Sequence, residues 1–304
     1  MSSMTNYLIS IVGSTAIGKT ALSIQLSKHY NCDIISSDSR QFFKEMSIGT
    51  AVPVEKELAE AKHYFIQNRS IFDDYNVGQF EKDALNKLDE LFLSNNIAVM
   101  VGGSGLYVDA VLKGLDYFPD VSPEVRMKLN ERLKSEGIQS LQDQLKELDL
   151  DSFNTIALEN PHRLIRALEI CIGTGKPYSY YKNKPKKKRN FTPIKIGLTA
   201  DREIMYNRIN QRVDEMMQNG LLDEVKKLHQ HKQLNALQTV GYRELFRFID
   251  GEIDLEFATS EIKKNTRRFA KRQGTWFRKD SEIHWFDFNS EVYNIISYID
   301  SKLK

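Results

Sequence analysis

Residues 13–20 read Gly-Ser-Thr-Ala-Ile-Gly-Lys-Thr, which matches the glycine-rich pattern GxxxxGK[ST] of phosphate-binding loops. An apolar run precedes this loop at residues 7–12, and a stretch typical of a helix follows it at residues 21–26. Between a strand and a helix, the loop turns its backbone N–H groups toward phosphate oxygens, Lys19 adds a positive charge, and the Thr20 hydroxyl can hold Mg²⁺. A nucleotide is the usual occupant, so an ATP or GTP site is the first interpretation. The members of this phosphate loop are Gly13, Ser14, Thr15, Ala16, Ile17, Gly18, Lys19 and Thr20.

Asp38 is the first candidate for acid–base chemistry. It lies in the polar stretch 37–41, directly after the apolar residues 34–36. A carboxylate near a diphosphate either coordinates a metal ion or accepts a proton from the group that attacks the carbon bearing the diphosphate. An Asp that caps the turn after a strand is the structural alternative. The sequence leaves these interpretations open.

A second glycine-rich turn, residues 102–105, follows the apolar run at residues 97–101 and carries the hydroxyl of Ser104. A loop that hydrolyses nucleotides usually works with an acidic residue at such a strand end, where it helps to hold Mg²⁺. No carboxylate stands there, although Asp33 or Asp38 could take its place. The nucleotide interpretation is therefore weakened but not excluded.

Arg208 and Arg212 lie one helical turn apart and therefore share a helix face. Arg212 could reach the phosphates as a second cation, because guanidinium groups suit a departing diphosphate whose negative charge grows in the transition state. A surface arginine paired with Asp214 or Glu215 is an equal alternative on sequence grounds.

Two basic stretches indicate a nucleic-acid substrate, although the formal net charge of +2 is small. Residues 176–189 hold seven Lys or Arg, no acid, and tyrosines at 178, 180 and 181, a composition suited to phosphate contact and base stacking. At helical spacing, residues 263–278 form a cationic stripe on one helix face. The same spacing predicts that Phe269 and Trp276 lie away from this stripe. The residues of this stripe are Lys264, Arg267, Arg268, Lys271 and Arg272.

The elements that must position these residues form an α/β protein. From residue 7 to about residue 115, short apolar strands alternate with amphipathic helices, which is typical of a parallel sheet whose ligands gather at the carboxyl ends of the strands. Residues 120 to about 175 show helical spacing only, and a strand resumes at residues 193–198. We therefore expect a P-loop NTPase-like parallel sheet core flanked by helices, residues 1–119 and 191–304, with an inserted all-helical domain at residues 120–190.

Composition excludes several other classes of protein. The chain has 304 residues, 41% hydrophobic and 28% charged, as in globular proteins, and its apolar runs stay well short of the roughly 18 residues that span a membrane. The apolar start has no basic leader, so we expect a cytoplasmic protein. Cys32 and Cys171 are the only cysteines, which argues against structural zinc and a disulfide framework.

Taken together, these motifs resemble the tRNA dimethylallyltransferase family, the isopentenyl transferases that modify adenosine 37 beside the anticodon. The order and spacing of the motifs make the resemblance specific, whereas only the phosphate loop is strong alone. The matching segments are residues 13–20, 38–41, 48–51, 101–107, 163–169, 240–243 and 270–276. The resemblance covers nearly the whole chain.

This resemblance implies transfer of the dimethylallyl group from dimethylallyl diphosphate to N6 of adenosine 37 in tRNA, with Mg²⁺ bound and diphosphate released. Asp38 would act as general base, Ser104 and Arg212 would assist at the diphosphate and the reacting centre, and the phosphate loop would hold the leaving group. The helical insertion would bind the anticodon stem-loop, and we expect a monomer. The residues implied in tRNA contact are Asp38, Ser39, Arg40, Gln41, Ser104, Arg126, His162, Arg163, Leu164, Ile165, Arg166, Gln238, Thr239, Val240, Gly241, Tyr242 and Arg243.

Three departures from the family pattern stand near the site. Ser14 replaces the usual Pro, Ser104 replaces the usual Thr, and Arg40 replaces a more usual apolar residue. Three other functions also use some of these motifs: a P-loop small-molecule kinase, an adenylate isopentenyltransferase that prenylates free AMP or ATP, and an RNA-binding module without activity. Neither a kinase nor an inactive RNA-binding module would explain why the phosphate loop, Asp38 and the basic helices occur in one chain.

Overall fold

The computed structural model describes residues 5–184 and 188–303. It divides into two compact units, one of residues 1–113 with 189–304, here called the core unit, and one of residues 114–188, here called the helical unit. The sequence pattern predicts the boundaries of the inserted domain at 119/120 and 190/191, a few residues from those of the helical unit. Residues 185–187 of the first basic stretch lie outside the described residues.

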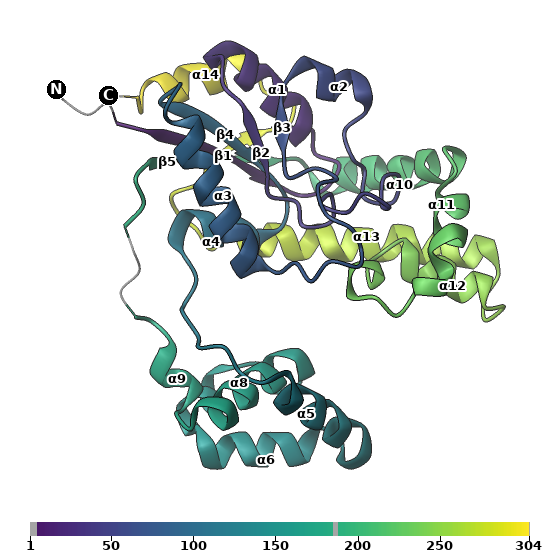
Figure 1. Ribbon diagram of the computed structural model, residues 1–304. Helices are drawn as coiled ribbons and strands as arrows, with labels where there is room; N and C mark the ends of the chain where they lie inside the picture. Colours follow the sequence, from purple (N-terminus) through teal and green to yellow (C-terminus); the bar gives the residue numbers. More distant parts are fainter. Residues whose placement is uncertain (1–4, 185–187, 304) are drawn as a thin grey trace. The chain divides into compact units, whose positions relative to one another are not determined.

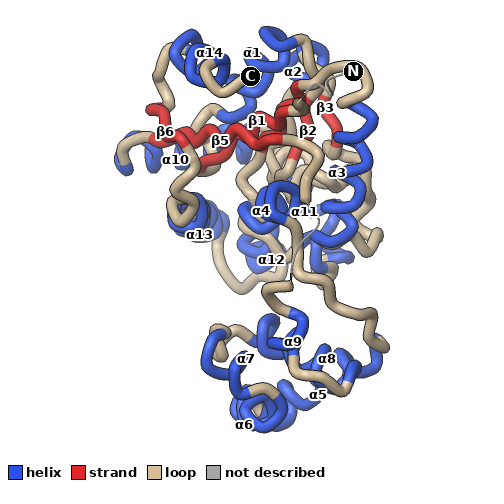
Figure 2. The backbone as a smooth tube through the Cα atoms, turned by 90° about the vertical axis from the view of Figure 1, so that its left-hand side faces the viewer, coloured by secondary structure: helices blue, strands red, loops and turns tan. Residues whose placement is uncertain are grey.

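A parallel sheet organises the core unit (Figure 2). Its order is β3-β2-β4-β1-β5-β6 among the described residues, and each neighbouring pair is parallel. This confirms the predicted α/β sheet core. The strands are β1 (Tyr7–Gly13), β2 (Ile34–Ser36), β3 (His63–Tyr64), β4 (Ile97–Val101), β5 (Thr192–Thr199) and β6 (His284–Asp287).

Helices cover both faces of the sheet (Figures 1 and 2). Ile9 and Ile11 of β1 pack on the side of α1 (Lys19–Tyr30) and α14 (Val292–Asp300). Leu8 and Val12, which alternate with them, pack on the other side. The helices there are α3 (Val77–Leu91), α4 (Gly105–Lys113) and the end of α13 (Leu255–Phe277). Because both faces are buried, β1 is apolar along almost its whole length.

A further apolar cluster joins helices that lie between β5 and β6 in the chain. Figure 1 shows these helices lying together. Val213, Leu221, Leu245 and Ile262 meet in this cluster, one from each of four helices. These are α10 (Arg202–Gln218), α11 (Leu221–Leu228), α12 (Tyr242–Ile249) and α13. The remaining short helices of the core unit are α2 (Glu55–Glu60), η1 (His229–His231) and η2 (Asn235–Leu237).

The helical unit has a core of its own. Leu129, Leu141, Leu164 and Leu168 are buried against one another from three different helices. Asn160 accepts hydrogen bonds from the N–H groups that begin α8, as the sequence Asn-Pro predicts. The helices are α5 (Pro123–Glu136), α6 (Ile138–Leu148), α7 (Leu150–Thr155), α8 (Pro161–Thr174) and α9 (Tyr178–Tyr181).

Arg189 corrects one expectation for the first basic stretch. Its guanidinium donates to the carbonyl oxygens of Ala110 (2.6 Å) and Val111 (2.8 Å) near the end of α4 and pairs with Glu81 (2.5 Å). The side chain is committed to the core unit, because the last carbonyls of a helix need donors from outside it. Arg189 is therefore not available for RNA. None of the described helices is long and apolar enough to span a membrane.

Candidate active site

Three loops meet at the carboxyl edge of the sheet. The phosphate loop follows β1, residues 37–41 follow β2, and the second glycine turn follows β4, which lies between β1 and β2. Carboxyl ends of neighbouring parallel strands lie at one edge, so the three loops line one site. Thr15, Lys19, Thr20, Asp38 and Arg212 line a single cavity there.

Two further cavities continue from the first. One, of about 920 Å³, also has Lys19, Thr20 and Arg212 in its wall, and its size suits a small-molecule ligand. The other has Asp38 and Arg212 in its wall together with Gly241. Asp38 and Arg212 therefore lie between the phosphate loop and the segment 238–243.

The phosphate loop is tightly built on the sheet. Gly13 has φ +148°, and a Cβ there would stand 2.7 Å from the carbonyl oxygen of Leu198 on β5, so only glycine fits. Gly18, with φ +105°, begins α1 in the left-handed region. Lys19 donates its ammonium group to the carbonyl of Ser14 at 2.8 Å. In this structure the lysine therefore caps its own loop.

Burial lowers the pKa of Lys19 to about 8, although nearby Asp38 acts to raise it and Arg212 acts to lower it further. The ammonium group of Lys19 is desolvated and lacks a full counter-charge, so an anion that binds beside it is stabilised. A diphosphate bound there would supply that charge and raise the pKa of Lys19 again.

Arg212 and Arg208 have different tasks. Arg208 donates from Nε to the carbonyl of Ala16 at 2.8 Å and so supports the phosphate loop. The side chain of Arg212 makes no hydrogen bond or ion pair with any described residue, and burial and the neighbouring Arg208 lower its pKa. Asp214 pairs with Lys263 instead, at 2.6 Å. The alternative of a surface pair for Arg212 is therefore wrong, and its guanidinium faces the cavity unpaired.

Asp38 and Ser104 lie on two loops that hydrogen bonds join to each other. Oδ1 of Asp38 accepts the N–H of Arg40 at 3.2 Å, which is the turn-capping role that the sequence allowed. The carboxylate also lines the cavity, so capping and chemistry are compatible. Oγ of Ser104 accepts the N–H of Ser39 at 3.0 Å and lies 3.0 Å from the Ser39 hydroxyl. Ser104 thus holds the loop that carries Asp38.

Gln273 of α13 joins the phosphate loop to the second glycine turn. Its Oε1 accepts the N–H of Thr15 at 2.9 Å, and its Nε2 donates to the carbonyl of Gly103 at 2.9 Å. Ser14 adds a bond from its hydroxyl to the carbonyl of Ala270 at 3.2 Å, so the departure from Pro gives the loop a further tie to α13. The sequence pattern predicted no role for Gln273. A polar Gln between the buried Ala270 and Phe277, on one helix face, is the signal that could have revealed it.

His63 is a cavity residue that sequence reasoning missed. It lies in β3, and its ring lines the cavity with Asp38 and Thr20. Nδ1 stands 2.8 Å from the carbonyl of Ala61, so Nδ1 carries the proton, and the buried Nε2 has no partner among the described residues. Burial lowers the pKa of His63, which keeps the ring neutral. A two-residue strand gives no periodic signal in the sequence.

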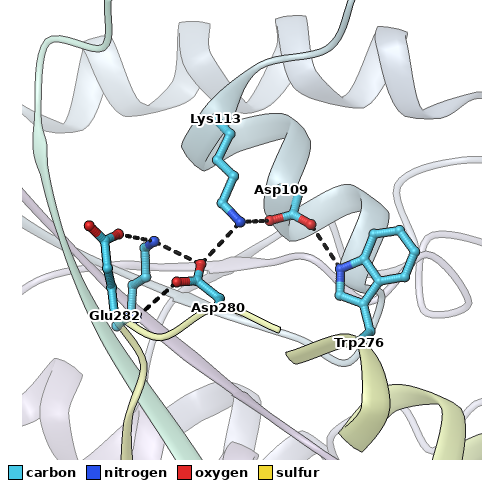
Figure 3. Close-up of polar contacts among 6 residues, drawn as sticks. Asp109, Lys113, Trp276, Asp280 and Glu282 are labelled. Atoms are coloured by element: carbon cyan, nitrogen blue, oxygen red, sulfur yellow. Dashed lines mark hydrogen bonds and ion pairs between the residues drawn. The ribbon is translucent and has the colours of Figure 1, made fainter. Parts of the chain in front are cut away.

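Beyond Gln273, α13 is fixed at its carboxyl end by an ionic network (Figure 3). Trp276 donates to Asp109 at 2.8 Å, and Lys113 pairs with both Asp109 (2.8 Å) and Asp280 (3.0 Å). The buried Lys195 of β5 also pairs with Asp280, at 2.8 Å. Burial alone would raise the pKa of Asp280, but the bonds from Lys195 and Lys113 lower it to about 2. The network ties α13 to α4 and to the sheet.

The cationic stripe on α13 is partly paired within the protein. Arg267 donates to Asn210 at 2.6 Å, and Lys264 pairs with Glu261 at 2.7 Å. Phe269 does not fall away from the stripe as predicted, because the Arg272 guanidinium lies 5.7 Å from its ring centre. The Arg40 guanidinium lies 4.1 Å from the centre of the same ring. The departure at Arg40 therefore places a further cation against the ring of Phe269.

In the helical unit, the residues expected to contact tRNA divide by exposure. His162 and Arg163 are exposed, whereas the side chains of Leu164 and Ile165 lie in the apolar core. Arg126 and Arg166 both pair with Glu169, at 2.7 Å and 3.0 Å. Tyr178 stacks on Phe118 and is not free for base stacking.

The segment 238–243 shows the same division. Gln238 and Arg243 are exposed, whereas Thr239, Val240 and Tyr242 are buried. Where a side chain is buried, a contact with RNA falls to the backbone or to exposed neighbours. The buried members of this segment set the position of the exposed ones.

Comparison with known proteins gives consistent matches in sequence. Residues 41–280 match a family model described as IPP transferase. The tRNA dimethylallyltransferase of Flavobacterium psychrophilum is 61% identical over 305 residues, with 98% of this chain and 99% of that protein covered. That of Christiangramia forsetii is 61% identical over 300 residues, with 99% of each covered.

Solved structures agree with the sequence matches. The full-length tRNA isopentenylpyrophosphate transferase of Bacillus halodurans superposes with a TM-score of 0.73 at 35% identity, over 98% of this chain and 97% of that one. A eukaryotic dimethylallyltransferase acting on tRNA gives a TM-score of 0.77 at 25% identity, over 93% of this chain and 74% of that one.

The parallel sheet and its P-loop-like phosphate loop, with Asp38, Lys19 and Arg212 in the wall of one cavity, are typical of a group-transfer enzyme. The matches cover nearly the full length of the chain and agree on a single chemistry, prenyl transfer to tRNA. The chain belongs to the IPP transferase family, the tRNA dimethylallyltransferases.

Proposed function

We propose that this enzyme transfers the dimethylallyl group of dimethylallyl diphosphate to N6 of adenosine 37 in tRNA and releases diphosphate. The observation that carries the proposal is that Asp38, Lys19 and Arg212 line the same cavity at the carboxyl edge of the sheet. A base opposite two cations is what this reaction needs, because a proton leaves the nucleophile while negative charge gathers on the leaving group.

The chain's own residues divide this work. An adenine inside a stacked loop cannot reach the cavity, so the target base must leave the stack before Asp38 can take a proton from its N6 amine. The bond from N6 to the dimethylallyl carbon forms as the bond from that carbon to the diphosphate oxygen breaks. Lys19, Arg212 and the N–H groups at the start of α1 hold the departing diphosphate.

Thr20 would hold Mg²⁺ together with the phosphate oxygens of the donor. It lines the same cavity as Lys19. Hard oxygen ligands of this kind, few in number and supplemented by water and phosphate, suit Mg²⁺. When bound, the ion would neutralise charge on the leaving diphosphate.

Recognition of the acceptor would use both units. The exposed His162 and Arg163 of the helical unit, and Gln238 and Arg243 of the core unit, are available for the anticodon stem-loop. Contacts between cations and phosphates dominate affinity for nucleic acids and make it depend strongly on salt. We expect a monomer that acts in the cytoplasm, where its tRNA substrate is found.

The test is an incubation of the purified enzyme with dimethylallyl diphosphate and unmodified tRNA, followed by mass analysis of the nucleoside at position 37. We expect dimethylallyladenosine there, dependent on Mg²⁺. Parallel reactions supply AMP as acceptor or ATP as donor. Prenylation of AMP with tRNA ignored would identify an adenylate isopentenyltransferase, and phosphoryl transfer without prenyl transfer would identify a kinase.

A further inference from the structure

The carboxylate of Glu224, in the first turn of α11, is completely engaged by a loop far away in the sequence. Oε2 accepts the N–H groups of Ser47 (2.9 Å) and Ile48 (2.8 Å), and Oε1 accepts the N–H of Gly49 at 3.0 Å. Three consecutive amides that converge on one anion form a nest, which backbone adopts around phosphate or carboxylate groups. Here the protein fills the nest with its own side chain.

The same carboxylate holds the segment expected to contact tRNA. Oε1 of Glu224 also accepts the hydroxyl of Tyr242, at 2.6 Å. The Tyr242 side chain is fully buried, and its ring packs so closely on Gly49 that a Cβ there would stand 2.5 Å from a ring carbon. Tyr242 begins α12 directly before the exposed Arg243. Glu224 is therefore the common partner of two segments.

The loop of residues 46–51 forms part of the catalytic cavity. Thr50 and Ala51 line it beside Asp38 and Arg212. Gln41 also holds this loop, since its Nε2 donates to the carbonyl of Ala51 at 2.9 Å. Ala51 has φ +52°, in the left-handed region that costs a residue with a Cβ. A loop in this conformation needs partners along its length: Gln41 binds it at Ala51, and Glu224 binds it at residues 47–49.

We infer that Glu224 is a positioning residue for the acceptor tRNA. It fixes the cavity wall beside Asp38 relative to the segment 238–243, so that the target adenine reaches Asp38 when the rest of the tRNA is bound at that segment. This inference rests on the proposed function and adds a residue to it. Gln is a poor substitute, because a neutral amide has one acceptor oxygen, and its NH₂ group would face backbone N–H donors. Displacement of a reacting group by about 1 Å can cost on the order of 100-fold in rate.

The experiment compares Glu224→Gln with wild type in steady-state prenylation of tRNA. We expect kcat/KM for tRNA to fall about 10- to 100-fold, with the KM for dimethylallyl diphosphate and the Kd for inorganic diphosphate changed less than about threefold. Tyr242→Phe, which removes one of the four bonds and leaves the nest filled, should lower kcat/KM for tRNA by only a few-fold.

Glu45→Gln is the matched control. Glu45 neighbours the same loop and accepts bonds from Ser70 and Ile71, but it does not line the cavities of the site. Its kcat/KM for tRNA should stay near wild type. An equal loss in Glu45→Gln, an unchanged kcat/KM in Glu224→Gln, or a parallel loss of diphosphate binding would each overturn the inference. If wild type itself fails to prenylate tRNA, the proposed function fails instead.

Discussion

Asp38 serves two purposes with one carboxylate, and an amide can replace only one of them. Asn would still accept the N–H of Arg40 through its oxygen and so preserve the turn, but it cannot take a proton from N6. We expect Asp38→Asn to lower kcat by about 10²- to 10⁴-fold and to change the Kd for tRNA only a few-fold. Single-turnover prenylation and filter binding measure the two quantities.

Asp33→Asn provides the control for this prediction. Asp33 precedes the same strand and accepts the hydroxyl of Tyr64 at 3.1 Å, outside the cavity. Its substitution should leave kcat close to wild type. Near-normal turnover in Asp38→Asn would remove Asp38 from the general-base role.

Lys19 gives the diphosphate site a pH dependence. Its pKa of about 8 in the free protein means that the ammonium group is charged below pH 8 and loses its proton above it. A bound diphosphate raises that pKa, so binding takes up a proton above pH 8. Affinity should then fall by up to about tenfold for each further pH unit, until the pKa of the complex is reached.

Lys19→Arg isolates this effect, because its guanidinium stays charged throughout the range. Calorimetric titrations of inorganic diphosphate at pH 7, 8, 9 and 10 should show a steeper loss of affinity in wild type than in Lys19→Arg. The ligand's own ionisation is common to both proteins and cancels in the comparison. Parallel pH profiles would show that Lys19 does not titrate in this range.

At the scale of elements, α13 holds two loops of the site together through Gln273. Gln273→Leu would leave the partly buried N–H of Thr15 and the buried carbonyl of Gly103 without their partner, at a cost of about 1–3 kcal/mol for the buried carbonyl. We expect a lower free energy of unfolding in urea and a weaker affinity for inorganic diphosphate, since the phosphate loop loses its tie to the second glycine turn.

The buried Gln142 of the helical unit supplies a matched substitution. It donates to the carbonyl of Leu158 at 3.3 Å, away from the phosphate loop. Gln142→Leu should lower stability and leave diphosphate affinity unchanged. If Gln273→Leu behaves in the same way, Gln273 supports the fold without shaping the cradle.

The elements that could be predicted from the sequence are those with strong local patterns. β1 and β4 are almost entirely apolar, and β5 places Ile194, Ile196 and Leu198 at alternate positions. The phosphate loop has a specific spacing. β3 and β6 escaped prediction because they are short, partly exposed edge strands, and His63 was lost with β3. Gln273 and Glu224 bond across 170 or more residues, and no local pattern encodes such a contact.

At the scale of the whole molecule, we expect the helical unit to unfold while the core unit stays folded. Leu168 is fully buried in a cluster made only of helical-unit residues. Leu168→Ala should cost that unit about 2–5 kcal/mol. We expect prenylation of tRNA to fall while the Kd for inorganic diphosphate stays near wild type.

Leu88→Ala is the counterpart in the core unit. Leu88 is as deeply buried, but against the sheet, in the cluster that includes Leu8 and Val12 of β1. This substitution should weaken diphosphate binding and tRNA prenylation together as the temperature rises. Loss of diphosphate binding in Leu168→Ala at the same temperature would show that the two units unfold as one.

The hydrogen bonds between Arg189 and the end of α4 allow the inserted segment to vary in length and sequence during evolution. The chain leaves the core unit just after α4 and re-enters it at Arg189, which is bonded to the carbonyls of Ala110 and Val111. The helical unit between these points is an insertion whose two ends are held together by the bonds between Arg189 and α4. Doubling the length of a loop adds only about 0.6 kcal/mol of closure entropy. Natural selection can thus change the inserted segment for different RNA partners without changing the catalytic residues of the core unit.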